Sequence, residues 1–310
     1  MKVASTAEIV CLGEPLLELV RAEHEAVGLH YRPGFGGDTS NAAIAAARQG
    51  ASVGFLTGLG RDEFGGQILD LWRDEGVDCS RVKLSDSAPT GIYFVHPHES
   101  ERHFTYYRAG SAASLYSSAD LPADYIGQAK VLHVSAISQA ISDCAADAVD
   151  SAIDIARAAG TKVSYDTNLR LKLWPLDKAR ETIHAAMSKA DLAFPSYDDA
   201  LELTGLSDVD AIIDFYLDLG AEIVALKLGE EGARIAVAGR RETIAPVAVS
   251  AVDSTGAGDA FAGGFLAYWL ETGDPFEAGR RAAVVAAHTV AGFGAIAPIP
   301  HRDRIRPTGY

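Results

Sequence analysis

The sequence predicts a single α/β domain over residues 1–310, with a mostly parallel β-sheet covered by helices on both faces and a small β-sheet lid beside it. Three observations support this fold. Short apolar runs of strand length alternate with helical patterns along most of the chain, as in repeated β-α-β units. One region carries β-runs without an intervening helix. Hydrophobic residues make up 48% and charged residues 22% of the chain, which is ordinary composition for a globular protein.

The alternation begins with two strand and helix pairs. Residues 9–14 are a short apolar run with a glycine near its end, suited to a buried strand. Residues 39–50 are alanine-rich, open with Thr and Ser as capping residues and close on glycine, which predicts a helix. The next expected strand is 53–57 and the next helix is 62–75.

The lid is predicted where this alternation is interrupted. Residues 90–95 and 103–108 are β-runs separated by a turn at 97–100. We therefore expect residues 85–110, with the weakly alternating segment 14–32, to form a small second sheet. Such sheets often bury an exposed face in a dimer, so we expect a homodimer through the lid.

After residue 125 the alternation resumes. The expected strands are 131–134, 162–166, 192–194 and 223–226, with a hairpin-like segment at 233–248. The expected helices are 144–159, 177–189, 197–204, 208–219, 257–272 and 275–291. Ligands of such folds bind at the carboxyl ends of the strands, so residues that follow the strands are the candidates for a site.

Charge and cysteine content exclude several classes of protein. The chain has 27 basic and 42 acidic residues, a formal charge of −15, which repels nucleic acid and anionic lipid surfaces. The first residues lack the apolar core of a signal peptide, and no apolar stretch has membrane-spanning length. Cys11, Cys79 and Cys144 have no paired spacing and are expected to be reduced and mostly buried. We expect a cytoplasmic protein that binds neither nucleic acid nor membrane.

The most informative segment is Asp-Ser-Thr-Gly-Ala-Gly-Asp at 253–259, where a glycine-rich turn opens directly into a helix. The backbone N–H groups of Gly256, Ala257 and Gly258 are expected to point outward at the positive end of the helix dipole, forming an anion hole for a phosphoryl group. Asp259 lies in the first turn, where it can accept the proton of a substrate hydroxyl. The alternative is an ordinary helix start with Asp259 as a dipole partner.

The chain resembles the ribokinase-type (PfkB) carbohydrate kinases over essentially its whole length. Asp-Ser-Thr-Gly-Ala-Gly-Asp-Ala-Phe at 253–261 is similar to their C-terminal signature. Gly-Gly-Asp-Thr-Ser-Asn-Ala-Ala at 36–43 is similar to their N-terminal Gly-Gly-x-x-x-Asn-x-Ala element. The resemblance implies a Rossmann-like core, a β-sheet lid, ATP and Mg²⁺.

The N-terminal element is interpreted as part of the sugar site. Gly34, Gly36 and Gly37 are expected to form a flexible turn before a helix that begins with Asp38 and Asn41. Both of these side chains can hydrogen bond to sugar hydroxyls. A capped helix preceded by a loop is the alternative.

The ATP site is expected mainly from the resemblance, since no Walker-type Gly-x-x-x-x-Gly-Lys-Ser/Thr loop is present. Residues 227–232 follow a buried strand and look like the adenine-side loop of the family, although an ordinary turn would fit as well. The resemblance assigns these residues to ATP: Asn168, Ser196, Lys227, Gly229, Gly232, Thr255, Gly256 and Gly258.

Three segments, 106–114, 166–174 and 194–199, are similar to the 2-keto-3-deoxygluconate kinase branch of the family. This similarity implies that Tyr93, Tyr106, Arg108 and Arg170 contact a sugar acid. The chemistry agrees, because arginine can pair with a carboxylate through two hydrogen bonds. A surface ion pair is the usual role of a single arginine and stays the alternative.

The expected metal ligands also come from the resemblance. Asp199 falls where many relatives carry the Glu of an Asn-x-x-Glu element tied to magnesium, and Ser196 replaces its Asn. An aspartate there has a shorter reach and would act through water, or it is only a first-turn helix acid. Asp253 and Thr255 match a monovalent-cation site of some relatives, which makes K⁺ a further candidate cofactor.

The expected reaction is transfer of the ATP γ-phosphoryl group to the 6-hydroxyl of 2-keto-3-deoxygluconate, giving 2-keto-3-deoxy-6-phosphogluconate, with Asp259 as the base. Two alternatives stay open: a kinase for a neutral sugar such as fructose or ribose, and a sugar-binding regulator that has lost catalysis. A dehydrogenase is disfavoured, because the N-terminal Gly-x-Gly-x-x-Gly is missing.

Overall fold

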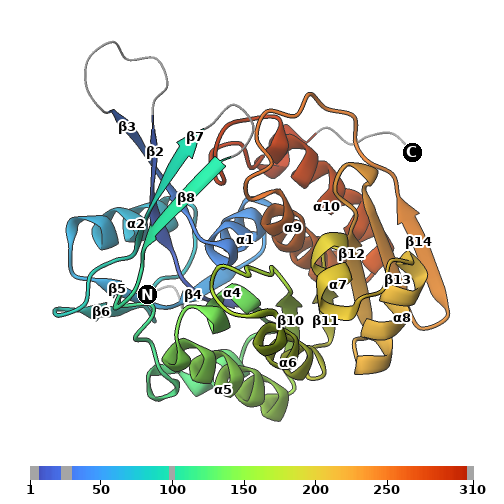
Figure 1. The fold of residues 1–310 in the computed structure, drawn as a ribbon, viewed down its shortest axis with the longest axis horizontal. Coiled ribbons are helices and arrows are strands. Elements are labelled where there is room, and N and C mark those ends of the chain that lie inside the picture. The colour runs from blue at the N-terminus through green and yellow to red at the C-terminus, as the bar shows by residue number, and fades with distance from the viewer. Residues whose placement is uncertain (1–6, 22–29, 98–101, 306–310) are drawn as a thin grey trace.

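The main sheet has eight strands in the order β14-β13-β12-β11-β10-β9-β1-β4 (Figure 1). In this computed structural model, residues 7–21, 30–97 and 102–305 are described. Six neighbouring strands are parallel: β1 (Ile9–Leu12), β4 (Val53–Leu56), β9 (Val131–Ser135), β10 (Lys162–Asp166), β11 (Leu192–Phe194) and β12 (Ile223–Lys227). The antiparallel hairpin of β13 (Ala233–Val237) and β14 (Arg240–Ile244) completes one edge. The predicted mostly parallel sheet is confirmed.

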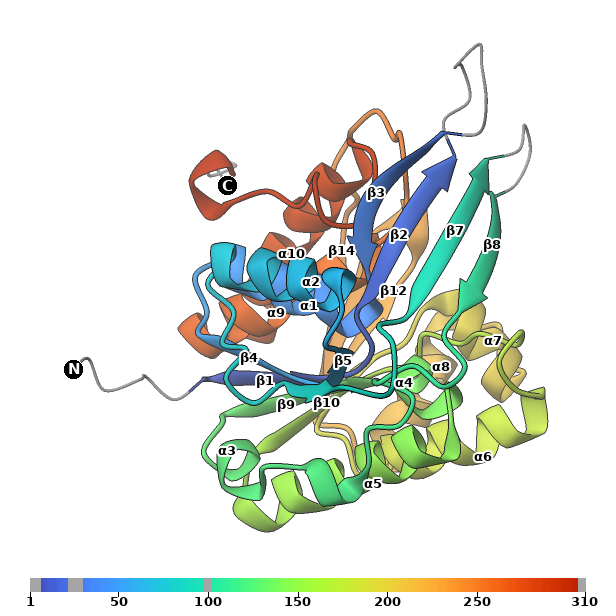
Figure 2. The ribbon, with the colours of Figure 1, turned by 90° about the vertical axis from the view of Figure 1, so that its left-hand side faces the viewer.

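Helices cover both faces of this sheet (Figure 2). Successive side chains of a strand point to opposite faces, so Ile9 and Cys11 pack into one core and Val10 and Leu12 into the other. The first core lies under α1 (Asp38–Arg48), α2 (Glu63–Asp74), α9 (Ala257–Thr272) and α10 (Pro275–Val290). The second lies under α3 (Ala123–Gly127), α4 (Ala136–Ala140), α5 (Asp143–Ala159), α6 (Leu176–Met187), α7 (Tyr197–Thr204) and α8 (Val209–Leu219). No helix among the described residues is both long and apolar enough to cross a bilayer.

The predicted lid is a four-stranded sheet in the order β3-β2-β7-β8. Its strands are β2 (Leu16–Arg21), β3 (Tyr31–Gly36), β7 (Ile92–Pro97) and β8 (Arg102–Tyr107), and they stand away from the main sheet (Figures 1 and 2). A third, two-stranded sheet joins β5 (Gly58–Gly60) to β6 (Lys83–Ser85). Parts of the expected lid, residues 22–29 and 98–101, lie outside the described residues.

Strand β3 corrects one prediction. Gly34 and Gly36, expected in a flexible turn, lie within β3 and pair with Glu18 and Leu16 of β2. Proline and glycine are poor strand formers, which hides this strand in the sequence. β3 is an edge strand, and an edge tolerates proline because only one side needs backbone donors. The first lid hairpin therefore extends to residue 36 rather than 32.

The cysteines are only partly as predicted. All three are free, as the spacing suggested, and Cys11 is buried in the core. Cys79 is half-buried and Cys144 is exposed, so the expectation of mostly buried thiols is wrong for these two.

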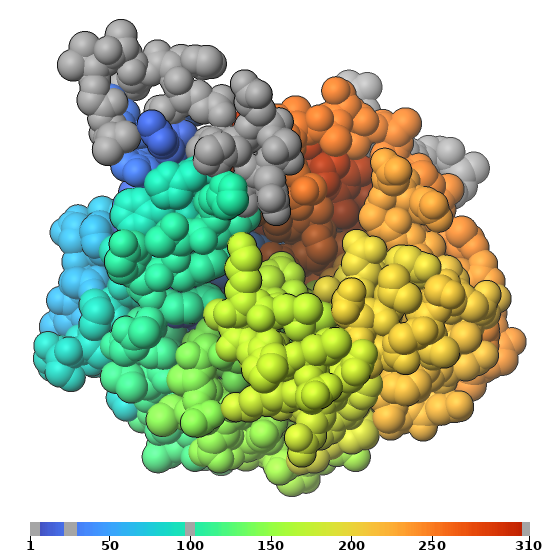
Figure 3. All heavy atoms as spheres, in the orientation of Figure 1, coloured from blue at the N-terminus to red at the C-terminus, as the bar shows by residue number. Residues whose placement is uncertain are grey.

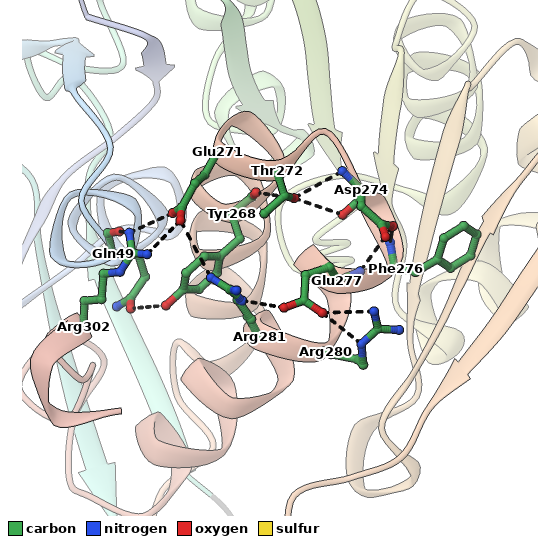
Figure 4. A network of polar contacts seen from close by, with 10 residues as sticks. All are labelled: Gln49, Tyr268, Glu271, Thr272, Asp274, Phe276, Glu277, Arg280, Arg281 and Arg302. Carbon is green, nitrogen blue, oxygen red and sulfur yellow. Dashed lines mark hydrogen bonds and ion pairs between the residues drawn. The ribbon is translucent and has the colours of Figure 1, made fainter. Parts of the chain in front are cut away.

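The C-terminal end of α9 is fixed by a polar network (Figure 4). The Tyr268 hydroxyl donates to Gln49 Oε1 at 3.0 Å, and Glu271 pairs with Arg302 at 2.7 Å. Asp274 then caps α10 by accepting the Phe276 N–H at 2.8 Å. Such caps stabilise a helix by about 1 kcal/mol. The network ties this end of α9 to α10 and to the chain beyond α1, so the end of α9 far from its glycine turn is held in place.

Candidate active site

The site lies where the carboxyl ends of β9, β10 and β12 meet the first turns of α1 and α9. The space-filling view is hollowed between the lid strands β7 and β8 and helix α9 (Figure 3). Because parallel strands present their carboxyl ends at one edge of the sheet, residues far apart in sequence converge there.

The close packing of α1 on α9 joins the two glycine-rich motifs. A Cβ atom on Gly263 would lie only 2.1 Å from the Ala42 carbonyl oxygen, so glycine is required for this approach. At the same crossing the Asn41 amide donates to Asp259 Oδ2 at 2.8 Å. The structure therefore brings together Asn41 and Asp259, two site residues predicted from separate motifs.

A second amide lies between two carboxylates. Asn168 Nδ2 is 3.3 Å from Asp38 Oδ2 and 3.4 Å from Asp259 Oδ1. Asn168 has a φ of 24°, a left-handed conformation that is unusual for a residue other than glycine. The resemblance assigns Asn168 to the nucleotide, whereas its side chain here lies between two carboxylates. The Ser135 hydroxyl also donates to Asp38, and no motif had indicated Ser135.

These carboxylates have perturbed acidities. Burial, and then the negative charge of Asp38, raise the pKa of Asp259 to about 7, while the Asn41 hydrogen bond opposes the rise. Burial also raises the pKa of Asp38. A carboxylate with a pKa near neutrality is suited to general-base catalysis.

Two buried oxygens of the cluster are available to a ligand. Asp38 Oδ1 and Asn41 Oδ1 accept no hydrogen bond from the described residues. Buried acceptors are normally satisfied, so both oxygens fit the hydroxyl groups of a bound molecule.

The turn before α9 carries the three N–H groups that were expected to form an anion hole. Gly256 has a φ of 76°, a left-handed conformation, and the helix begins at the next residue. A left-handed residue followed by helical residues directs successive N–H groups to one side of the chain. Within the described residues the N–H groups of Gly256 and Gly258 donate no hydrogen bond. The Ala257 N–H donates to the Ser254 carbonyl at 3.2 Å. The prediction that Ala257 also points outward is therefore wrong, since its N–H closes the turn.

Asp253 ties this turn to the chain after α10. Its Oδ1 accepts the Thr255 hydroxyl at 2.7 Å and the Thr255 N–H at 3.0 Å, and its Oδ2 accepts the Gly294 N–H at 2.9 Å. The two expected monovalent-cation ligands thus bond to each other.

Lys227 ends β12 and points to the same centre. Its ammonium group pairs with Asp166 Oδ2 at 2.6 Å, and a Cβ atom on Gly258 would lie 3.5 Å from the Lys227 Nζ. Asp166 was not among the predicted site residues, although it is the last residue of a buried strand, where an acid needs a partner. Gly229 and Gly232 form the turn after Lys227, and the φ of Gly232 is 93°.

Ser196 and Asp199 support the loop after β10. Asp199 Oδ2 accepts the Thr167 hydroxyl at 2.9 Å and the Leu169 N–H at 3.1 Å. Ser196 caps α7 by accepting the Asp199 N–H at 3.2 Å. Among the described residues, no three or more His, Cys, Asp or Glu side chains are grouped to hold a metal ion.

The lid contributes a row of aromatic and charged side chains above the site. Tyr93 donates to Glu18 and stacks on Tyr106, with 5.5 Å between ring centroids. A Cβ atom on Gly36 would lie 2.4 Å from the Tyr93 hydroxyl oxygen, and one on Gly34 would lie 2.9 Å from Glu18 Oε1, so both glycines leave room for these side chains.

Arg108 is held by an unpredicted acid, Glu14. The Arg108 guanidinium lies 4.8 Å from the Tyr106 ring centroid and pairs with Glu14 at 2.5 Å. The Glu14 side chain is fully buried and also accepts the Ser111 hydroxyl at 3.1 Å. Two acids, Glu14 and Glu18, in an otherwise apolar run are the signal that could have found them.

Arg170 differs from Arg108. It is exposed in the loop after β10, donates to the Leu169 carbonyl at 2.8 Å, and makes no ion pair with a described residue. Its charge lowers the pKa of Asp38 and of Tyr106, in both cases against a larger effect of burial. Arg170 is therefore a cation beside the carboxylate cluster and the lid.

Comparison with known proteins gives a consistent result. Residues 6–302 match the model of the pfkB family carbohydrate kinases. The chain is 36% identical to a 2-dehydro-3-deoxygluconokinase of Thermoproteus tenax, over 92% of this chain and 88% of that one. It is also 36% identical to a probable fructokinase of Arabidopsis thaliana, over 83% and 81% of the two chains. The solved structure of a fructokinase from Xylella fastidiosa with bound ATP aligns with a TM-score of 0.85 at 27% identity, covering 95% of both chains.

Proposed function

Because this chain belongs to the pfkB family of carbohydrate kinases and is an ATP-dependent sugar kinase, we propose that it phosphorylates 2-keto-3-deoxygluconate, also called 2-dehydro-3-deoxygluconate. The ATP γ-phosphoryl group passes to the 6-hydroxyl, and the product is 2-keto-3-deoxy-6-phosphogluconate.

Arg170 is the observation that supports this substrate. Arg108 already pairs with the buried Glu14 side chain, whereas Arg170 has no carboxylate partner among the described residues. A cation without an ion-pair partner attracts an anionic ligand, and a sugar acid supplies the carboxylate that Arg170 lacks. The similarity to the Thermoproteus tenax enzyme supports the same choice.

The remaining groups have matching roles. Asp259 accepts the proton of the reacting hydroxyl, while Asp38 and Asn41 accept hydrogen bonds from other hydroxyls of the sugar. The N–H groups of Gly256 and Gly258 stabilise charge on the moving phosphoryl group. The lid, with Tyr93 and the rest of its inner face, excludes water from the transfer.

Mg²⁺ fits the residues present as an ion bound mainly by the ATP phosphates and water. One oxygen of Asp199 accepts two protein hydrogen bonds, which leaves the other oxygen to face such an ion through water. Bound Mg²⁺ neutralises charge that develops on the phosphates. A K⁺ ion beside Asp253 and Thr255 stays a prediction from the resemblance.

A neutral ketose is the second candidate, supported by the similarity to the Arabidopsis thaliana fructokinase. The oxygens of Asp38 and Asn41 would serve fructose equally well, since they recognise hydroxyls and not a carboxylate. A regulator without catalysis is disfavoured, because Asp259 and both glycine amides are in place.

Phosphorylation rates over a panel of sugars and sugar acids, in wild type and in Arg170→Ala, test the substrate. We expect kcat/KM for the keto-acid to exceed that for fructose, and to fall roughly 100-fold in the variant through the loss of a charge-assisted contact. The rate with fructose should change little. A preference for fructose that Arg170→Ala leaves unaltered would show that the proposed substrate is wrong.

We also propose a cytoplasmic homodimer whose subunits pair through their lids. The unpaired cysteines support a reducing compartment. The outer face of the lid carries a cluster of aromatic side chains, and a second copy would cover them: Tyr31, Phe94, His96 and Tyr107.

A further inference from the structure

Lys227 begins the loop 227–232, but its ammonium group lies at the glycine turn of α9 and does not extend along that loop. A Cβ atom on Gly258 would be 3.5 Å from Lys227 Nζ and 3.7 Å from Cδ, so the lysine side chain runs along this glycine. Its charge also lowers the pKa of Asp259, although burial and Asp38 dominate there, and it adds to the effect of burial that lowers the pKa of His133.

Asp166 holds this lysine in position. The carboxylate is buried, its Oδ2 accepts the Lys227 ammonium at 2.6 Å, and its Oδ1 accepts the Asn168 N–H at 3.1 Å. An ammonium group has three donors, and among the described residues only Asp166 takes one. Two donors therefore remain beside the free N–H of Gly258.

The carboxylates around Asp259 make the site negatively charged, so a cation is needed there before a phosphoryl group can approach. Asp38, Asp166 and Asp259 all lie within electrostatic reach of one another, and a phosphoryl group that enters this cluster adds further negative charge. The glycine amides supply only partial positive charge. Lys227 is a cation that pairs with Asp166 and acts on Asp259 and neutral His133.

We propose that Lys227 is a catalytic residue that donates hydrogen bonds to the γ-phosphoryl group of ATP during transfer, and that Asp166 is a positioning residue for it. The acceptor oxygen forms a bond to the γ-phosphorus while the bond from that phosphorus to the bridging oxygen breaks, and its electron pair stays on ADP. The hydroxyl proton passes to Asp259, and Lys227 keeps all its protons. The inference rests on phosphoryl transfer and not on the identity of the sugar.

Lys227→Met tests the proposal, with the sugar that wild type phosphorylates fastest. We expect kcat to fall about 10²- to 10³-fold, because one hydrogen-bond donor to the transition state is lost. The KM of the sugar should stay within about threefold of the wild-type value. Calorimetry should show a roughly tenfold loss of affinity for ATP and little change for ADP, which lacks the γ-phosphoryl group. Lys162→Met is the matched control, because Lys162 pairs with Asp191 and Glu222 at the other end of β10.

The pH profile separates a catalytic role from a structural one. Lys227→Met should move the acid limb of kcat/KM to higher pH, because a cation near Asp259 is lost, whereas Asp166→Asn should move it to lower pH, because an anion is lost. If Lys227→Met does not fold, the double variant with Asp166→Asn removes both buried charges and should show the same loss of kcat. Three results would overturn the proposal: a folded Lys227→Met variant with kcat within threefold of wild type, equal losses of affinity for ATP and for ADP, or acid limbs that move in the same direction in Lys227→Met and Asp166→Asn.

Discussion

At the scale of single residues, neighbouring amides and carboxylates have opposite effects on the protonation of Asp259. Burial and Asp38 favour its protonated form, and Asn41 at 2.8 Å favours the ionised form. Asn168 holds the second oxygen of Asp259 and also Asp38, at a backbone conformation that few residues adopt. The amides thus orient a carboxylate whose pKa lies near neutral pH.

This balance predicts an acid limb in the pH dependence of the kinase. With a pKa raised to about 7 in the free enzyme, Asp259 is increasingly protonated below that pH and cannot accept the hydroxyl proton. We expect kcat/KM to fall about tenfold per pH unit on the acid side. Steady-state rates measured from pH 5 to 9, with the coupling enzymes of the assay in excess, will show this fall in kcat/KM.

The control for this profile is Asp259→Asn. It should lose about 10²- to 10⁴-fold in kcat and also lose the acid limb, because the titrating base is gone. A variant that keeps the limb of wild type would assign the titration to another group, such as Asp38.

At the scale of elements, the approach of α1 to α9 decides whether Asn41 reaches the base. The contact depends on Gly263, where a side chain would meet the Ala42 carbonyl at 2.1 Å. The far end of α9 is fixed by the network around Tyr268 and Glu271 (Figure 4). A change at Gly263 must therefore displace α1, since α9 is held.

Gly263→Ala should accordingly cost stability and activity together. We expect the free energy of unfolding to fall by about 1–3 kcal/mol through overpacking, and kcat to fall because Asn41 and Asp259 separate. Urea denaturation and steady-state rates measure the two effects.

Gly66→Ala is the matched control in another helix. A Cβ atom on the exposed Gly66 of α2 would meet nothing within 4 Å, so this variant should keep kcat and gain up to about 1 kcal/mol. Equal effects of the two substitutions would contradict the role given to the α1 and α9 contact.

At the scale of the whole molecule, the lid has two different faces. Strand alternation places Tyr93 and Tyr106 on the inner face with the site, and the aromatic cluster with Phe94 on the outer face. Tyr107 in that cluster is 66% exposed. This outer face is the surface that the proposed dimer would cover.

Sedimentation equilibrium tests the dimer through this face. We expect wild type to be a dimer at micromolar concentration, and Tyr107→Asp to shift it toward monomer, because a buried charge without a partner is costly. Leu201→Asp, at a 38% exposed position of α7, is the control and should stay dimeric. A monomeric wild type would exclude this pairing, and a dimeric Tyr107→Asp would place the interface elsewhere.

Local sequence signals determined much of this protein. The alternation of apolar runs and capped helices predicts the order of the main elements, because strand and helix periods are set by neighbouring residues. The glycine turn before Asp259 and the Asn41 element were identifiable for the same reason, since each is a local chain geometry with its own residue requirements.

Only the tertiary structure decided which of these groups meet, and with which partners. Edge strand β3 forms despite Pro33, because β2 supplies its hydrogen bonds. Lys227 lies at the glycine turn of α9 because β10 places Asp166 beside it, and Arg108 is held below the lid because the chain after β1 brings Glu14 to it. Such pairings join residues far apart in the chain, and no local pattern carries information about which charge a buried side chain will face.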